Sequence, residues 1–455
     1  MANLNQATAA LKDGTGQRLY ERARTLIPGG TQLFSKRPEM FAPKQWPTYF
    51  AEATGCEVVD MDGKRFVDMC TCGIGATVLG YADPDVTAAV QDRVAKGVMC
   101  MLNPPDEVEL AELMLQIHPW AQMVRFGRMG GESMTMAVRI ARASTRRDRV
   151  AFCGYHGWHD WYLSANLPED PKVAMDDRLG DYHLMPGLEP AGVPRGLTGT
   201  ALPFHYNKID QLKAIVDKHG SELAAIVMEP IRHFDPEPGF LEGVRDLADR
   251  SGARLIFDEI TIGWKLCLGG AHLKLGIEPD VAVFAKTTGN GHPISAVIGK
   301  AETMQAAQDT FISSALWTEA VGPAAGVATV KKLMRIDVPA HIARVGQQAR
   351  DGLATLAKEH RVPLQQSGRP GMTFYNFEHP KAPALQTLWT VRMLERGYLV
   401  CGGFYPMYAH TPEHVGPYLE ATAPVFAEIG EAIEKDDIEV RIGGPVQHTG
   451  FQRLA

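Results

Sequence analysis

Residues 254–286 read RLIFDEITIGWKLCLGGAHLKLGIEPDVAVFAK, and this stretch decides the fold. Two short apolar runs bound it, Arg254–Phe257 and Val281–Ala285, and each is followed directly by a residue that can do chemistry, Asp258 and Lys286. Such runs are typical of buried parallel strands, and the residues between them are numerous enough for a crossover connection. We therefore expect Asp258 and Lys286 at the carboxyl ends of two parallel strands.

The same pattern continues on the N-terminal side of this stretch. The apolar runs Arg149–Cys153 and Ala224–Met228 predict two further strands, with helical stretches between them. Tyr155-His156-Gly157 follows the first run and Glu229-Pro230 follows the second. Ligands of open α/β sheets bind beyond the carboxyl ends of the strands, so we expect all of these residues to line one pocket.

The two ends of the chain differ from this central part. A helix is predicted over residues 17–27, and a hairpin over residues 56–69 turns at Asp62-Gly63. After Val330, helical segments alternate with weak strand signals at residues 372–377 and 398–400. The fold class is therefore α/β, with residues 76–330 as the large domain and residues 1–75 and 331–455 as parts of a smaller α+β domain.

Composition narrows the class of partner. The 455 residues include 46 basic and 53 acidic side chains, a net charge of −7, and 45% are hydrophobic, which excludes a disordered or fibrous chain. No basic excess suits nucleic acid, and no run of about 18 apolar residues suits a membrane. The seven cysteines form no CxxC pair, and because the opening residues have neither the basic start nor the apolar core of a signal peptide, we do not expect export. We expect a small-molecule partner and a cytoplasmic location.

Each candidate residue also has an ordinary structural interpretation. Lys286 enters a glycine-rich loop and could form a Schiff base as a buried amine, or it could be a solvated lysine at a strand end. Asp258 could pair with a protonated ring nitrogen or cap a turn. Gly130-Gly131 precede a helix and could bind an anion through backbone amides, or form a plain turn.

Rival chemistries have little support in the sequence. His156, His159 and Asp160 could be imagined as metal ligands. The i, i+3 pair of histidines lacks the HExxH arrangement, however, and would need a further ligand that the sequence does not indicate, so we expect no metal. The phosphate loop GxxxxGK[ST], the GxSxG elbow and the GxGxxG fingerprint do not occur.

Taken together and in this order, the motifs resemble the class III, pyridoxal-phosphate-dependent aminotransferases. The resemblance covers nearly the whole chain and favours the branch of glutamate-1-semialdehyde aminomutase and related sugar and aminoglycoside aminotransferases. The motifs that carry it are Ile27-Pro28-Gly29-Gly30, Val59-Asp60-Met61-Asp62-Gly63, Tyr155-His156-Gly157, Met228-Glu229-Pro230, Leu255-Ile256-Phe257-Asp258-Glu259, Gly269-Gly270-Ala271, Pro279-Asp280 and Lys286 with Gly289-Asn290-Gly291.

The resemblance implies fold type I, pyridoxal 5′-phosphate as the cofactor, and a homodimer. It implies that Lys286 forms the Schiff base, that Asp258 holds the pyridinium charge, and that Tyr155 stacks on the ring. It further implies that His156 and Glu229 lie in the cofactor site and that Gly130 and Gly131 bind the phosphate. Three residues of the neighbouring subunit would reach that phosphate: Ser313, Ser314 and Thr318.

Four positions depart from the pattern of the family. Met129 and Gly131 stand where the family usually has Ser and Thr or Ser, Ala315 where Thr is usual, and Lys265 where Arg is usual. The phosphate therefore loses hydroxyl partners. At about 0.5 to 1.5 kcal/mol for each neutral hydrogen bond, we expect a cofactor that dissociates more readily than in relatives.

The substrate is less well determined by the sequence. The resemblance implies an amino-acid donor and a carbonyl acceptor, and residues 34–41 and 313–319 favour a polar, sugar-like acceptor, with epimerase or aminomutase chemistry as the alternative. A substrate carboxylate would need an arginine, for which Arg37, Arg232 and Arg369 are candidates. Several acidic and aromatic side chains could suit a hydroxylated, cationic ligand: Asp235, Glu237, Trp158, Trp161 and Tyr408.

Overall fold

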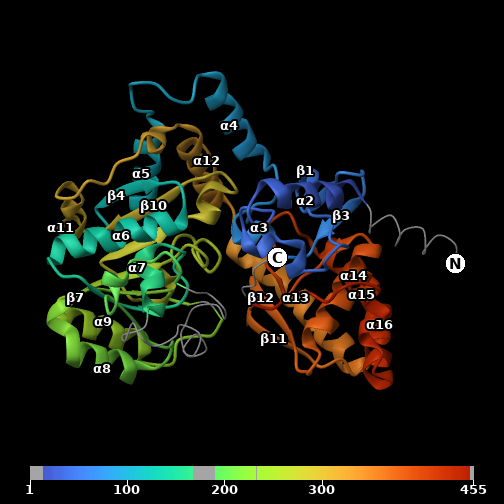
Figure 1. Ribbon diagram of the computed structural model, residues 1–455. Coiled ribbons are helices and arrows are strands. Elements are labelled where there is room, and N and C mark those ends of the chain that lie inside the picture. Colours follow the sequence, from blue (N-terminus) through green and yellow to red (C-terminus); the bar gives the residue numbers. More distant parts are fainter. Residues whose placement is uncertain (1–13, 168–189, 232, 451–455) are drawn as a thin grey trace. The chain divides into compact units, whose positions relative to one another are not determined.

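The computed structural model describes residues 14–167, 190–231 and 233–450. The chain divides into two compact units (Figure 1). The larger unit comprises Pro84–Pro339, and the smaller unit combines the N-terminal part of the chain, up to Asp83, with the C-terminal part from Ala340 onward.

A seven-stranded sheet forms the centre of the larger unit. Its strands are β4 (Met123–Gly127), β5 (Arg149–Cys153), β6 (Ala201–Pro203), β7 (Leu223–Met228), β8 (Arg254–Asp258), β9 (Val281–Phe284) and β10 (Ser295–Gly299). Their order across the sheet is β4-β10-β9-β8-β7-β5-β6. β10 is antiparallel to both of its neighbours, and the other strands run parallel to one another.

Helices cover both faces of this sheet because its strands are apolar on both sides. Val227 and Ile256 belong to the apolar layer that includes helix α6 (Gly130–Thr145). Ile226 and Leu255, one residue before each of them, belong to the opposite layer with α8 (Ile209–His219) and α9 (Phe240–Ser251). Successive strand residues point to opposite faces, so a continuous apolar run is what such a strand requires.

Shorter elements complete the larger unit. They are α4 (Pro84–Ala95), α5 (Asp106–Ile117), α7 (Asp160–Leu163), α10 (Ala271–Leu275), α11 (Ala301–Met304), α12 (Val321–Arg335) and the single 3-10 turns η7 (Lys286–Gly289) and η9 (Ala315–Thr318). The four strands predicted from the sequence are confirmed as β5, β7, β8 and β9, with ends that differ by one residue at most. The α/β fold class with a mostly parallel sheet is confirmed as well.

The smaller unit contains two antiparallel-rich sheets and several helices. One sheet has the order β1-β2-β3-β13 and the other β11-β12-β14. The predicted hairpin is confirmed as β2 and β3, which pair antiparallel. The elements are α2 (Thr15–Leu26), β1 (Phe50–Thr54), β2 (Glu57–Asp60), β3 (Arg65–Asp68), α3 (Cys72–Gly75), α13 (Val338–Glu359), β11 (Leu364–Arg369), β12 (Met372–Phe377), α14 (Ala382–Glu395), β13 (Tyr398–Leu399), β14 (Gly403–Phe404), α15 (Pro412–Lys435) and α16 (Ile438–Ile442).

Among the helices that the structure describes, none combines the length and the apolar character needed to cross a bilayer.

Candidate active site

The carboxyl edge of the large sheet carries the polar residues that the sequence singled out. Asp258 is the last residue of β8, and Glu229 directly follows β7. Tyr155 lies two residues beyond β5, and Lys286 lies two residues beyond β9. Because these strands are parallel and adjacent in the order β9-β8-β7-β5, the four residues emerge along one edge.

Asp258 forms a buried pair with His156. The Oδ2 atom of Asp258 lies 2.8 Å from Nδ1 of His156, and both side chains are almost fully buried. Nε2 of His156 lies 3.1 Å from the carbonyl oxygen of Cys153, while Oδ1 of Asp258 accepts the backbone N–H of Ile260 at 3.0 Å. Both oxygens of the carboxylate are thus oriented by the protein, as is usual for a buried polar group.

Lys286 begins η7 with an unusual backbone. Its φ of 46° lies in the left-handed region, which a side chain with a Cβ rarely adopts. Its Nζ atom donates a hydrogen bond to Oγ1 of Thr261 at 2.9 Å. Residues held in such conformations concentrate at functional sites, because the surrounding structure must enforce them.

A second lysine supports the residues around Lys286. Lys265, only 5% exposed, donates from Nζ to the carbonyl oxygen of Thr261 at 2.8 Å and to Oγ1 of Thr287 at 2.9 Å. Thr261 therefore contacts both lysines, one through its hydroxyl and one through its carbonyl. Lys265, which stands where arginine is usual in the family that the sequence resembles, fixes the two threonines beside Lys286.

Behind this edge, Glu259 anchors the turn that leads into α10. Its carboxylate accepts the N–H groups of Ala271 and His272 at 2.9 and 3.0 Å, and Nδ1 of His272 lies 2.8 Å from it. Nε2 of His118 accepts the N–H of Gly270 at 3.0 Å, and burial lowers the pKa of His118 to about 4. His118 is therefore neutral near pH 7, as its acceptor role requires.

The start of α6 offers unpaired backbone amides. Gly130 and Gly131 are its first two residues, and the first N–H groups of a helix have no partner within it. Glu132 turns its carboxylate back to accept the N–H groups of Arg128 and Met129, at 2.8 and 3.2 Å. A Cβ added at Gly130 would lie 2.9 Å from Cδ1 of Ile260, so the chain after Asp258 passes close to this helix start.

Glu229 holds the loop that presents Tyr155. Its buried Oε2 accepts the backbone N–H of Tyr155 at 3.3 Å, and a Cβ at Gly154 would lie 2.8 Å from the same oxygen. The ring of Tyr155 meets Tyr162 edge to face and remains 47% exposed. An aromatic face on a fixed loop is available to a flat ligand.

Ser313, Ser314 and Thr318 belong to a segment fastened to the start of α6. Nε1 of Trp317 donates to Oε1 of Glu132 at 3.0 Å, and the guanidinium of Arg128 donates to the carbonyl oxygens of Trp317 and Glu319. Ser313 and Ser314 are exposed, whereas Thr318 is half-buried and donates to the carbonyl oxygen of Ala315 at 2.9 Å.

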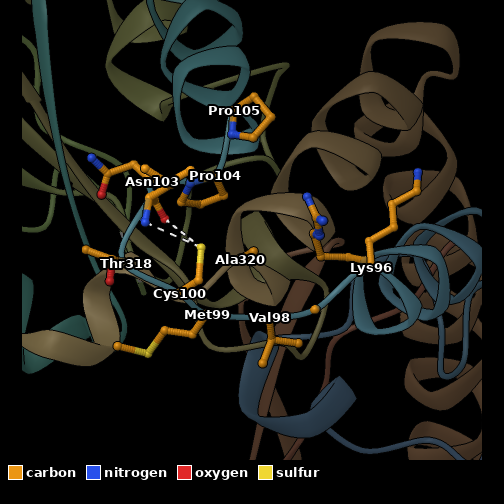
Figure 2. Close-up of a pocket in the computed structure, with 12 residues that line it drawn as sticks. Lys96, Val98, Met99, Cys100, Asn103, Pro104, Pro105, Thr318 and Ala320 are labelled. Carbon is orange, nitrogen blue, oxygen red and sulfur yellow. Dashed lines mark hydrogen bonds between the residues drawn. The ribbon is translucent and has the colours of Figure 1, made fainter.

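One side of Thr318 lines a surface pocket with the loop that follows α4. Figure 2 shows Met99, Cys100, Asn103 and Thr318 around this pocket, whose volume is about 190 Å³. The N–H of Ala320 donates to the carbonyl oxygen of Val98 at 2.9 Å, which ties the loop to the Thr318 segment.

The remaining expectations concern substrate contacts, candidate arginines and metal ligands. The interpretation of Trp161 as a ligand contact is wrong, because its side chain is buried in the apolar layer of α6. Arg37 and Arg369 belong to the smaller unit, and Arg232 lies outside the described residues. None of the described histidine, cysteine and carboxylate side chains gather in a group of three or more that could hold a metal ion.

Sequence reasoning missed Thr261 and the position of His159. Thr261 carried no signal, because a threonine three residues after a strand end is unremarkable until the fold brings Lys286 to it. For His159, the signal in the sequence was the glycine at residue 131, where the family resemblance predicts a hydroxyl residue. In the structure, the imidazole of His159 occupies the space of a side chain at residue 131.

The residues present fit a phosphorylated pyridine aldehyde. A buried carboxylate suits a protonated ring nitrogen, a helix start with two glycines suits a phosphate, and Lys286 supplies an amine. A Cβ at Gly130 would lie 2.9 Å from Cδ1 of Ile260, and a Cβ at Gly131 would lie 3.0 Å from Nδ1 of His159, so a side chain at either position requires its neighbour to shift.

Comparison with known proteins agrees with this site. Residues 41–415 match the family described as aminotransferase class-III. The chain is 30% identical to a 3-aminobutyryl-CoA aminotransferase of Cloacimonas acidaminovorans over 92% of this chain and 98% of that protein. It is 31% identical to a 2'-deamino-2'-hydroxyneamine transaminase of Streptomyces kanamyceticus, over 84% and 92% of the two chains.

Two further similarities concern the aminomutases and the fold. A glutamate-1-semialdehyde 2,1-aminomutase of Desulfovibrio desulfuricans is 34% identical over 71% of this chain and 75% of that protein. The FumI protein of Sphingopyxis sp. MTA144, solved with pyridoxal phosphate, superposes with a TM-score of 0.82 at 26% identity, over 92% of this chain and 98% of that chain. The chain thus belongs to the class III aminotransferases, enzymes of fold type I that depend on pyridoxal 5′-phosphate.

Proposed function

We propose that this aminotransferase moves an amino group from an amino-acid donor to a carbonyl of a polar, sugar-like acceptor, in a homodimer. The observation that carries the chemistry is the edge of the large sheet, where the buried Asp258–His156 pair and Lys286 emerge from the ends of parallel strands. When bound, pyridoxal phosphate supplies an electron sink that stabilises negative charge at the substrate carbon.

Lys286 would bind the cofactor through its amine and afterwards carry the proton between substrate and cofactor atoms. A lysine must lose its proton to act as a nucleophile or base. Thr261 accepts a hydrogen bond from Nζ and so orients the amine. Lys265 holds Thr261 and Thr287 in place, which keeps Lys286 in its left-handed backbone conformation.

Asp258 would accept the N–H of the protonated pyridine ring and keep that ring charged. His156 holds the carboxylate from behind through Nδ1, at 2.8 Å. The backbone N–H of Ile260 binds the other carboxylate oxygen, so the protein fixes the direction in which Asp258 faces the ring. Tyr155, on the loop held by Glu229, would stack on the ring.

Gly130 and Gly131 would bind the phosphate through their backbone N–H groups at the positive end of α6. Ser313, Ser314 and Thr318 would reach the phosphate of the neighbouring subunit. The exposed, apolar loop beside Thr318 supports a homodimer: Met101 is 98% exposed and Leu102 is 79% exposed. Neighbouring apolar side chains left open to water mark a protein–protein contact.

A polar acceptor is supported by the loop after Glu229-Pro230. Phe234, Asp235 and Glu237 are exposed there. Asn207 fixes the loop, since its Nδ2 donates to the carbonyl oxygen of Asp235 at 3.0 Å and its Oδ1 accepts the N–H of Glu237 at 2.9 Å. Acidic and aromatic side chains on a fixed loop suit a hydroxylated, cationic ligand. The similarity to an aminoglycoside transaminase adds support.

The test has two stages. The holoenzyme is first mixed with glutamate, glutamine or alanine, and discharge of the visible cofactor band identifies the donor. The discharged enzyme is then mixed with aldehyde or ketone acceptors of three classes: an oxidised aminoglycoside, a β-keto acid and a plain α-keto acid. Because the first half-reaction is reversible, the α-keto acid that corresponds to the donor must return the band and serves as the positive control. Return with the aminoglycoside ketone as well supports the proposal, and return with keto acids alone refutes the sugar-like acceptor. Asp235→Asn with Glu237→Gln is expected to raise KM for the aminoglycoside ketone only.

A second candidate is an aminomutase or epimerase reaction, which the similarity to glutamate-1-semialdehyde aminomutases favours. In that reaction the amino group stays within one substrate, or a proton leaves and returns on opposite faces. Incorporation of solvent deuterium into an amine substrate without net transfer to a second carbonyl compound would identify it.

A further inference from the structure

His159 takes the place of a side chain at the start of α6. A Cβ added at Gly131 would lie 3.0 Å from Nδ1 and 3.1 Å from Cε1 of His159, and 3.7 Å from the next nearest atom, Cα of Gly157. The imidazole therefore fills the space into which residue 131 would otherwise project. The resemblance of the sequence to its family leads us to expect a serine or threonine there.

The Nδ1 atom of His159 is buried and has no hydrogen-bond partner among the described residues. The ring itself is well positioned. It stacks on Trp158 with ring centroids 4.5 Å apart and an interplanar angle of 22°. The backbone carbonyl oxygen of His159 accepts the N–H of Tyr162 at 2.9 Å. Buried polar atoms in native proteins are almost always satisfied, so an orphaned ring nitrogen beside free helix amides points to an absent acceptor.

The ionisation of His159 is compatible with this role. Burial lowers its pKa, and the nearby carboxylates of Glu132 and Asp160 act in the opposite direction with smaller effect. The ring is therefore neutral near pH 7 and carries one N–H, which can reside on Nδ1. A negatively charged acceptor would select that tautomer.

We propose that His159 binds the phosphate of the cofactor by donating from Nδ1, and that it replaces the hydroxyl group that residue 131 supplies in relatives. The proposal rests on the placement of the phosphate at the start of α6. It also revises the expected loss of affinity, because one of the missing donors is restored by another residue. Gly131 and His159 then form a matched pair, since a side chain at residue 131 and the imidazole cannot share the space.

Gly131 and His159 can be substituted one at a time and then together. His159→Ala removes the donor and opens the space, and Gly131→Ser introduces a hydroxyl that collides with the imidazole. The double variant, Gly131→Ser with His159→Ala, has room for the serine because Cα of Gly157 is its next neighbour, at 3.7 Å from the added Cβ. Single losses with recovery in the double variant are the signature of direct replacement.

The experiment measures equilibrium binding of pyridoxal 5′-phosphate and of pyridoxal, which lacks the phosphate, to the full-length apo protein. His159→Ala and Gly131→Ser are each expected to weaken binding of the phosphorylated form by about tenfold to a hundredfold, the effect of a hydrogen bond to a charged group. Binding of pyridoxal should not change, and the double variant should recover most of the lost affinity. His205→Ala, at an exposed position, is the control.

Other outcomes would overturn the inference. Equal affinities of His159→Ala and wild type for pyridoxal phosphate would exclude the hydrogen bond, and equal losses for both ligands would indicate a structural role. Should His159→Ala fail to fold, His159→Asn keeps a donor near the position of Nδ1 and should retain the preference for the phosphorylated ligand; loss of that preference would equally refute the proposal. Failure of the proposed function would give a different result, because then neither pyridoxal 5′-phosphate nor pyridoxal would bind to Lys286.

Discussion

In the proposed site, the charge of Asp258, held by His156, is the electrostatic feature that we expect to matter most for the reaction. Asp258→Asn keeps an oxygen for the N–H of Ile260 but removes the negative charge that would hold a protonated ring nitrogen. We expect kcat to fall by about a hundredfold or more, as for other preorganised electrostatic contacts, with little change in the melting temperature. Steady-state kinetics and thermal denaturation of the variant measure both quantities. Full activity of Asp258→Asn would show that this carboxylate does not touch the cofactor.

The residues of the site could be predicted where they directly follow a strand. Asp258, Glu229 and Lys286 each follow an apolar run, so their positions along the sheet edge could be derived from the sequence. The contacts of Thr261, Lys265 and His159 could not, because they depend on turns after the strands whose paths are set by tertiary packing.

At the scale of single elements, β8 is the strand on which the site depends. Ile256 is fully buried in the layer that includes α6, two residues before Asp258. Ile256→Ala should lower the free energy of unfolding by about 2 to 5 kcal/mol, since it removes buried methyl groups and leaves a cavity. Chemical denaturation measures the change, and Val440→Ala, at a position 83% exposed, should remain within about 0.5 kcal/mol of wild type. Equal stability of the two variants would contradict the described packing.

Two buried histidines should make stability depend on pH. Burial lowers the pKa of His118, near α10, and of His410, in the smaller unit, from 6.5 to about 4 in each case. The unfolded chain therefore binds these protons more readily, and the free energy of unfolding should fall as pH drops from about 6.5 towards 4, by up to about 3 kcal/mol for each histidine.

Urea denaturation between pH 7 and pH 4 tests this expectation. His118→Gln cannot titrate in this range, so its profile should be flatter than that of wild type although its stability at pH 7 is lower. The exposed His205→Gln should reproduce the wild-type slope. A wild-type stability that does not change over this interval would contradict the buried, neutral state of both histidines.

The elements themselves were predictable to different degrees. The strands β5, β7, β8 and β9 follow from continuous apolar runs, and the β2–β3 hairpin follows from its Asp-Gly turn. The pairing of β13 with β3 joins residues 398 and 399 to residues 67 and 68, and no local pattern specifies a contact over such a separation. The strands β4, β6 and β10 were not predicted, and nothing in the sequence pattern indicated the antiparallel direction of β10.

At the scale of the whole molecule, the proposed dimer depends on the exposed loop beside Thr318. Met101→Glu with Leu102→Glu would place charges at positions that the second copy should cover, and burying unpaired charges is strongly unfavourable. Sedimentation velocity should give half the wild-type mass, together with weaker binding of pyridoxal phosphate. Val440→Glu is the control for an added surface charge. A wild-type protein that sediments as a monomer and is fully active would contradict the dimer.

We propose that Lys286 and Asp258 form one cofactor site in this class III aminotransferase. The most direct measurement is the visible absorbance spectrum of the purified protein before and after addition of glutamate, glutamine or alanine, with Lys286→Ala as the control. We expect the wild type to show a long-wavelength absorbance band that one donor discharges. In Lys286→Ala this band should be missing or insensitive to donors. A protein that shows no such band after pyridoxal phosphate is supplied, or a Lys286→Ala variant that behaves as wild type, would contradict it.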